Sequence, residues 1–132
     1  MERSLEGVVL LDVSPGAGQE FERDFLEKVG HPALVCHGPH EHLCPLLAGQ
    51  GCEKFDAAHG IVFELDLDRA EHRAIVQRYR ELAREDLPIH VVATPEQAAR
   101  YADLLADVEV WTHLPTAADL DGFAAEVEAA DR

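Results

Sequence analysis

Five times between Gly7 and Arg132, a short apolar segment of strand length runs into a polar stretch with helical spacing. Strands that alternate with helices predict a parallel sheet covered by helices on both faces. The expected fold class is therefore a three-layer α/β domain with a five-stranded parallel sheet. The predicted strands are GVVLLDV (7–13), PALVCH (32–37), GIVFELDL (60–67), PIHVVAT (88–94) and VEVWTH (108–113).

The chain shows no linker, internal repeat or low-complexity segment, so we expect residues 1–132 to form a single domain. Thr94 and Thr116 are predicted N-caps, and Pro95 suits the first position of a helix. Glycines and prolines in 38–59 predict a short or broken second helix. Apolar spacing predicts buried stripes in the other helices: Phe21, Phe25 and Val29; Ile75, Tyr79 and Leu82; Ala98, Tyr101, Ala102 and Leu105; Leu120, Phe123, Ala124 and Val127.

The formal net charge of -15 argues against a nucleic acid or an anionic membrane as partner, because both require a positive surface. No apolar run approaches the roughly 18–20 residues that cross a bilayer, and the first residues do not resemble a signal peptide. We therefore expect a cytoplasmic protein.

The carboxyl ends of parallel strands lie at one edge of the sheet, where α/β proteins bind their ligands. Five βα units in this order resemble the receiver domain of bacterial response regulators, which has a flavodoxin-like fold with strand order 2-1-3-4-5. The resemblance covers nearly the whole chain and is one of pattern. In that family an acidic pair ends strand one, the phospho-accepting Asp ends strand three, Ser or Thr ends strand four, and Lys-Pro ends strand five.

This chain keeps part of that set. Asp12 keeps one carboxylate of the acidic pair, but Val13 replaces the other. An ungapped alignment puts Glu64 at the phospho-acceptor, whereas a slip of two residues puts Asp66 there, on the same face of the strand. The hydroxyl and Lys positions correspond to Thr94 and His113.

The resemblance implies a divalent metal such as magnesium at these carboxylates and a lysine to bind the acyl phosphate. The only two lysines, Lys28 and Lys54, lie far from this position in the sequence. We therefore predict a signalling site that is not phosphorylated in the ordinary way, and a Glu64 acceptor would carry a fixed negative charge. The alternatives are structural: solvated carboxylates at a helix start, Thr94 as a cap, and His113 as a polar strand-end residue.

All three cysteines and several histidines lie in the segment 36–52. Thiolate and imidazole ligands predict a zinc or iron–sulfur site, although the spacing matches no known ligand signature. Buried unpaired thiols and a redox disulfide are the alternatives. The candidate ligands are Cys36, His37, His40, His42, Cys44 and Cys52.

No Ser-His-Asp, Cys-His or paired-carboxylate motif is recognisable, so a non-enzymatic signalling or interaction module is expected. The second hypothesis is a metal- or redox-responsive binding protein that uses the segment 36–52. We expect a protein partner, which includes a second copy of the chain in a homodimer. The family's recurring partner surface, formed by the fourth helix, fifth strand and fifth helix, would contain Tyr101, Trp111 and His113.

Overall fold

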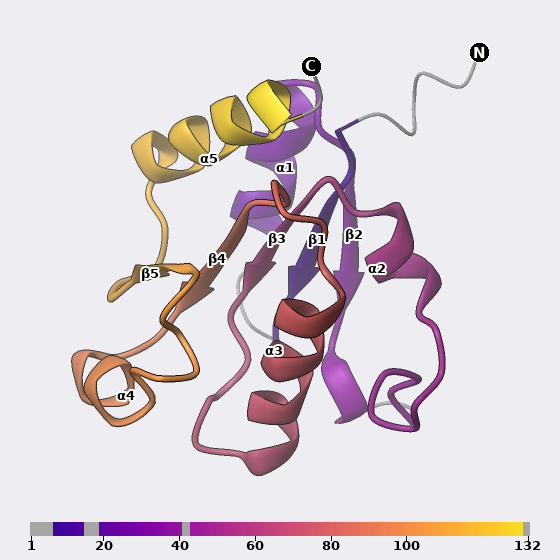
Figure 1. Ribbon diagram of the computed structural model, residues 1–132. Helices are drawn as coiled ribbons and strands as arrows, with labels where there is room; N and C mark the ends of the chain where they lie inside the picture. Colours follow the sequence, from indigo (N-terminus) through magenta and orange to yellow (C-terminus); the bar gives the residue numbers. More distant parts are fainter. Residues whose placement is uncertain (1–6, 15–18, 41–42, 131–132) are drawn as a thin grey trace.

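In the computed structural model, residues 7–14, 19–40 and 43–130 are described. Neighbouring strands all pair in parallel, in the order β2-β1-β3-β4-β5, with helices on both faces of the sheet (Figure 1). The predicted three-layer architecture and strand order are therefore confirmed. The strands are β1 (Val9–Asp12), β2 (Ala33–Cys36), β3 (Gly60–Phe63), β4 (Ile89–Val92) and β5 (Glu109–Trp111).

Two hydrophobic layers cover the sheet. On one face, α1 (Gln19–Lys28) and α5 (Ala117–Ala130) pack on side chains such as Leu11 and Val62. On the other face lie α2 (Glu53–Ala57), α3 (Ala70–Leu82) and the turns that follow α4 (Pro95–Arg100). A 3₁₀ turn, η2 (Gly38–His40), precedes α2, as expected of a broken second helix.

Helix α5 packs very closely on the sheet. Its predicted stripe of Leu120, Phe123, Ala124 and Val127 is buried, which confirms the helical spacing. At the start of β3, a Cβ on Gly60 would lie 2.7 Å from Val127 Cγ2 and 2.8 Å from Phe123 Cζ. Only glycine allows this approach without a shift of the helix.

Two buried histidines tie α5 to the rest of the fold. His90 of β4 bonds to Glu126 at 3.1 Å, and its ring also contacts the rings of Trp111 and Phe123. His31 bonds to Glu128 at 3.0 Å. These contacts give α5 polar anchors in addition to its apolar stripe.

The predicted stripe of α1 is wrong. Phe21 is 52% exposed and Val29 is also exposed, whereas Glu22 and Leu26 are buried. The helix is rotated relative to the prediction, which places Glu22 inside, beside Glu64, as described below. Leu82, at the end of α3, is likewise exposed rather than buried.

Helix α4 is shorter than predicted. It ends at Arg100, and a series of turns then carries Leu105 into the core. The predicted N-cap is confirmed: Thr94 and Gln97 form a reciprocal capping box, with Pro95 in the first turn.

Strand β3 ends at Phe63, four residues before the predicted end. The Asp66 side chain accepts a hydrogen bond from Asp68 N at 3.0 Å, which turns the backbone out of the sheet. Leu65 and Leu67 are buried in this loop. The expectation that Glu64 and Asp66 share a strand face is therefore wrong, since both lie beyond the strand.

Within the described residues, no helix combines the length and apolar character that crossing a membrane requires.

Candidate functional site

An open depression of about 360 Å³ lies at the carboxyl edge of the sheet. It brings together four residues that the sequence suggested as a signalling site. Asp12, the fifth, does not line it. The four are Glu64, Asp66, Thr94 and His113.

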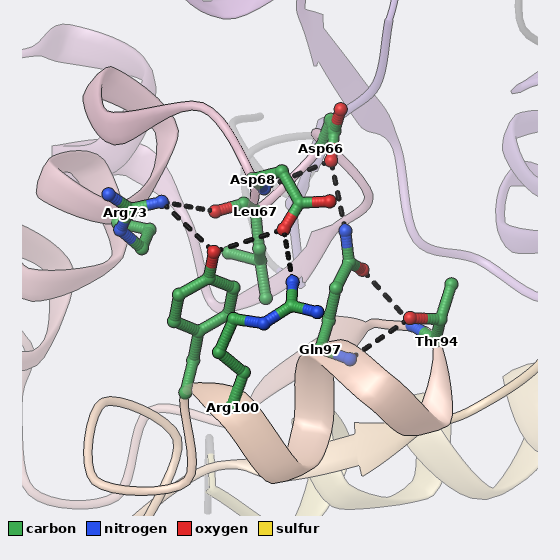
Figure 2. A network of polar contacts seen from close by, with 8 residues as sticks. Asp66, Leu67, Asp68, Arg73, Thr94, Gln97 and Arg100 are labelled. Atoms are coloured by element: carbon green, nitrogen blue, oxygen red, sulfur yellow. Dashed lines mark hydrogen bonds and ion pairs between the residues drawn. The ribbon is translucent and has the colours of Figure 1, made fainter.

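Asp66 is joined to the start of α4 (Figure 2). Its Oδ1 accepts a hydrogen bond from Gln97 Nε2 at 3.0 Å. The same Gln97 accepts from Thr94 N through Oε1 at 3.1 Å, and its backbone N donates to Thr94 Oγ1 at 3.0 Å. Gln97 therefore caps the helix and holds the carboxylate that precedes α3.

A second set of contacts lies beside the first (Figure 2). Asp68 Oδ1 accepts from Arg100 Nη1 at 2.9 Å and from the Tyr101 hydroxyl at 3.0 Å. The Tyr101 hydroxyl, then Gln97 and Arg100, hold the pKa of Asp68 below its ordinary value. Arg73 of α3 donates to the Tyr101 hydroxyl at 3.2 Å and lies over its ring. The β3–α3 loop and α4 are thus linked by several side chains.

Replacing Gln97 with Ala is expected to loosen α4 without unfolding the protein. The change removes the bond to Asp66 and half of the capping box, at a cost of about 0.5–2 kcal/mol in α4 stability. Hydrogen exchange should quicken at the amides of α4 and stay unchanged in β1 and β3. Glu96→Ala, in the same turn, is the control. Unchanged exchange in α4 of Gln97→Ala would show that the network does not hold this helix.

Glu64 does not point freely into the depression. Its carboxyl lies against that of Glu22 from α1, which is only 5% exposed, and one oxygen of each carboxyl is buried without a hydrogen-bond partner. Burial, and then the neighbouring Glu22, raise the pKa of Glu64 to about 9. Burial also raises the pKa of Glu22. Two carboxyl groups in contact hold a shared proton, so Glu64 is not a fixed negative charge at neutral pH, contrary to the sequence-based expectation.

His113 lines the depression together with its neighbours Thr112 and Leu114. Its ring bonds to Asp119 Oδ2 at 2.9 Å, and Asp119 also accepts from Thr116 N at 3.0 Å. The Thr116 contacts and then His113 lower the pKa of Asp119. Asp119 N donates in turn to Thr116 Oγ1 at 3.2 Å, so Thr116 caps α5 as predicted. His113 is tied to the start of α5.

Asp12 faces the other side of the sheet. It is 1% exposed, and its Oδ2 accepts a hydrogen bond from the Tyr79 hydroxyl at 2.6 Å. Burial raises the pKa of Asp12 to about 7, although Tyr79, Cys36 and Lys54 oppose the rise. Val13 is buried among apolar side chains. The end of β1 therefore gives no carboxylate to the carboxyl-edge depression.

The three cysteines all line a second pocket, together with Asp12. They are free thiols: Cys44 is buried, and Cys36 and Cys52 are half-buried. In the described part of the chain, no three His, Cys, Asp or Glu side chains are placed to hold a metal ion. The ring of His37 instead bonds to the Val13 carbonyl at 2.8 Å.

The predicted zinc or iron–sulfur site thus has no support from the described residues. Two candidate ligands fall outside them: His42 entirely, and the side chain of His40. The buried-thiol alternative describes what the structure has, since burial followed by Asp12 raises the pKa of Cys36 to about 11. A thiol with so high a pKa is a poor nucleophile.

Solved structures with the same arrangement include response regulator proteins and a sensor protein. A response regulator receiver protein from Pseudomonas putida superposes with a TM-score of 0.61 at 19% identity, over 94% of this chain and 97% of that chain. The chain has the receiver fold. A response regulator from Burkholderia multivorans matches with a TM-score of 0.59 at 17% identity, over 94% of both chains.

A sensor protein from Polaromonas is similar as well, with a TM-score of 0.57 at 18% identity, over 93% of this chain and 94% of the other. No protein-family model and no curated protein matches the sequence. At these identities the likeness establishes the receiver fold, and the residues themselves must carry any argument about function.

Proposed function

We propose that this protein is a receiver-like signalling module that binds a protein partner and is not phosphorylated in the ordinary way. The observation that carries the proposal is the link from Asp66 through Gln97 to α4. A change of charge or occupancy at the depression alters the first turn of α4 directly. An interaction surface that includes α4 would thereby respond to the depression.

The residues at the carboxyl edge argue against ordinary phosphorylation. Phosphoryl transfer to a carboxylate needs a divalent metal held by several carboxylates and a cation for the phosphoryl oxygens. Asp12 faces another pocket, and Glu64 lies against the buried carboxyl of Glu22. Of the two lysines, Lys28 ends α1 and Lys54 donates to the Val35 carbonyl at 2.8 Å.

Incubation with acetyl phosphate and Mg²⁺ tests this reading. We expect the intact mass of the protein to stay unchanged, because the acceptor candidates lack the metal carboxylates and the lysine. A receiver domain known to accept phosphate from acetyl phosphate is the positive control. A stable gain of one phosphoryl group that disappears in Asp66→Asn or Glu64→Gln would contradict the proposal.

The partner surface that we propose is formed by α4, β5 and the start of α5. Trp111 and Tyr101 are half-buried there, His113 is exposed, and Leu114 is 69% exposed. Aromatic side chains are enriched at protein interfaces, and an exposed leucine adds apolar area that a partner can cover. Light scattering over a range of concentrations distinguishes a homodimer from a different protein partner, and Leu114→Asp should weaken either complex.

A further inference from the structure

A second pocket of about 360 Å³ lies on the α2–α3 side of the sheet, away from the carboxyl-edge depression. Its floor is the end of β1, where Asp12 and Leu10 lie, and α3 contributes Ile75 and Tyr79. The remaining wall is the segment from Cys44 to Lys54. No residue of this pocket takes part in the function proposed above.

The walls of this pocket are mainly apolar. Leu10, Leu46 and Ile75 are buried aliphatic side chains, and the Tyr79 ring stacks on Phe55 with centroids 5.1 Å apart. Cys36 adds polarizable, uncharged surface, since the thiol is its stable form. A cavity of this size and lining suits a small organic molecule.

The polar end of the pocket is a carboxyl group. Among the described residues, the Tyr79 hydroxyl donates a hydrogen bond to the Asp12 carboxyl at 2.6 Å. The Cys36 thiol lies near enough to lower the pKa of Asp12, and both groups are uncharged. The Lys54 ammonium also lines the pocket, but it donates to the Val35 carbonyl at 2.8 Å. The carboxylate therefore lacks a directly bonded cation, and a buried anion without one is costly.

We propose that this pocket binds a small primary amine with an apolar body, whose ammonium group pairs with Asp12. The apolar body would lie between Leu46 and Ile75. A ligand carboxylate would instead meet Asp12 and Glu53, and among the described lining residues only Lys54 could offset them. The overall charge of -15 also attracts cations and repels anions.

Three probes of one shape test the charge that the pocket recognises: benzylamine, benzyl alcohol and benzoate. Benzylamine is expected to bind with a Kd on the order of 1 mM, as for a fragment of its size. Adding benzylamine should shift the backbone amide NMR signals of Gly38, Gly51 and Cys52. The amide signals of residues that line the carboxyl-edge depression should not move. Equal or tighter binding of benzyl alcohol or benzoate, or no binding of benzylamine, overturns the proposal.

Matched variants separate recognition from folding. Asp12→Asn keeps the shape of the side chain and should weaken benzylamine at least tenfold while leaving benzyl alcohol unaffected. Lys54→Met should tighten benzylamine severalfold, because it removes the resident cation near Asp12. Asp66→Asn, which removes a charge at the carboxyl-edge depression, should leave the affinity for benzylamine unchanged. Unchanged affinity in Asp12→Asn, or weaker benzylamine binding in Lys54→Met, contradicts the pairing with Asp12.

Discussion

The protein is expected to be about 2–4 kcal/mol more stable at pH 5 than at pH 8. Over this range the native state holds more protons than the unfolded chain, and each extra proton changes the free energy of unfolding by about 1.4 kcal/mol per pH unit. Most proteins lose stability on mild acidification when their carboxylates are paired. Here the buried carboxyls Asp12, Glu22 and Glu64 all have raised pKa values.

The direction follows from where these protons are lost. An unfolded chain releases them near pH 4, but the folded protein holds the Asp12 proton to about pH 7 and the Glu64 proton to about pH 9. The contribution of these carboxyl groups to the free energy of unfolding is therefore fully present below pH 4 to 5. It is lost as the pH rises through 7 and toward 9. Self-repulsion at a net charge of -15 acts in the same direction.

Urea unfolding of Glu64→Gln at both pH values measures this effect. The amide keeps a hydrogen-bond donor for Glu22 and has no proton to lose, so the variant should gain about 1–2 kcal/mol at pH 8, a value reduced because Glu64 keeps some contact with solvent. Little change is expected at pH 5. The exposed Glu85→Gln is the matched control. A Glu64→Gln variant that is destabilised equally at both pH values would refute the shared-proton interpretation.

Tyr79→Ala is expected to destabilise the protein by about 3–5 kcal/mol, the usual cost of deleting a buried aromatic ring. The ring stacks on Phe55 and meets Phe63 edge-on at 6.3 Å. Its hydroxyl also satisfies Asp12 at 2.6 Å. The side chain thus joins α2, α3 and the centre of the sheet.

Tyr79→Phe separates packing from hydrogen bonding. It retains the ring but leaves the buried carboxyl without its strongest donor, at an expected cost of about 1–3 kcal/mol. Tyr101→Phe, which removes a hydroxyl at the surface network, is the control, with a smaller expected loss of below about 1 kcal/mol. If chemical denaturation shows equal losses of stability for Tyr79→Phe and Tyr101→Phe, the buried hydrogen bond to Asp12 contributes no more than the surface one, which contradicts the prediction.

The arrangement of strands could be predicted because it depends on local pattern. Each of the five apolar segments forms a parallel strand, and the spacing of Leu120, Phe123 and Val127 gives the buried face of α5. The start of α4 was visible in the sequence as Thr94 followed by Pro95. What the sequence did not indicate was the second role of Gln97, since its contact with Asp66 joins residues far apart in the chain.

The phase of α1 could not be predicted for a related reason. Hydropathy assigns Phe21 to the core and Glu22 to solvent, but the carboxyl of Glu64 makes the inner position suitable for a second carboxyl. Such a pair is invisible to any pattern that scores residues singly. The sequence also did not indicate which face of the sheet the Asp12 side chain occupies, because that depends on a hydrogen bond from the Tyr79 hydroxyl of α3. Polar pairs, more than apolar ones, decided where the candidate site differs from expectation.

The contact of Gly60 with Phe123 and Val127 has a consequence for how this sequence can change over time. A methyl group at position 60 needs space that these two side chains occupy, at 2.8 and 2.7 Å. Any lineage or design that adds a side chain there must shorten one of its partners on α5. Because α5 also carries Glu126 and Glu128 to the histidines of the core, a displaced helix would break those bonds as well. Positions 60, 123 and 127 should therefore vary as one unit.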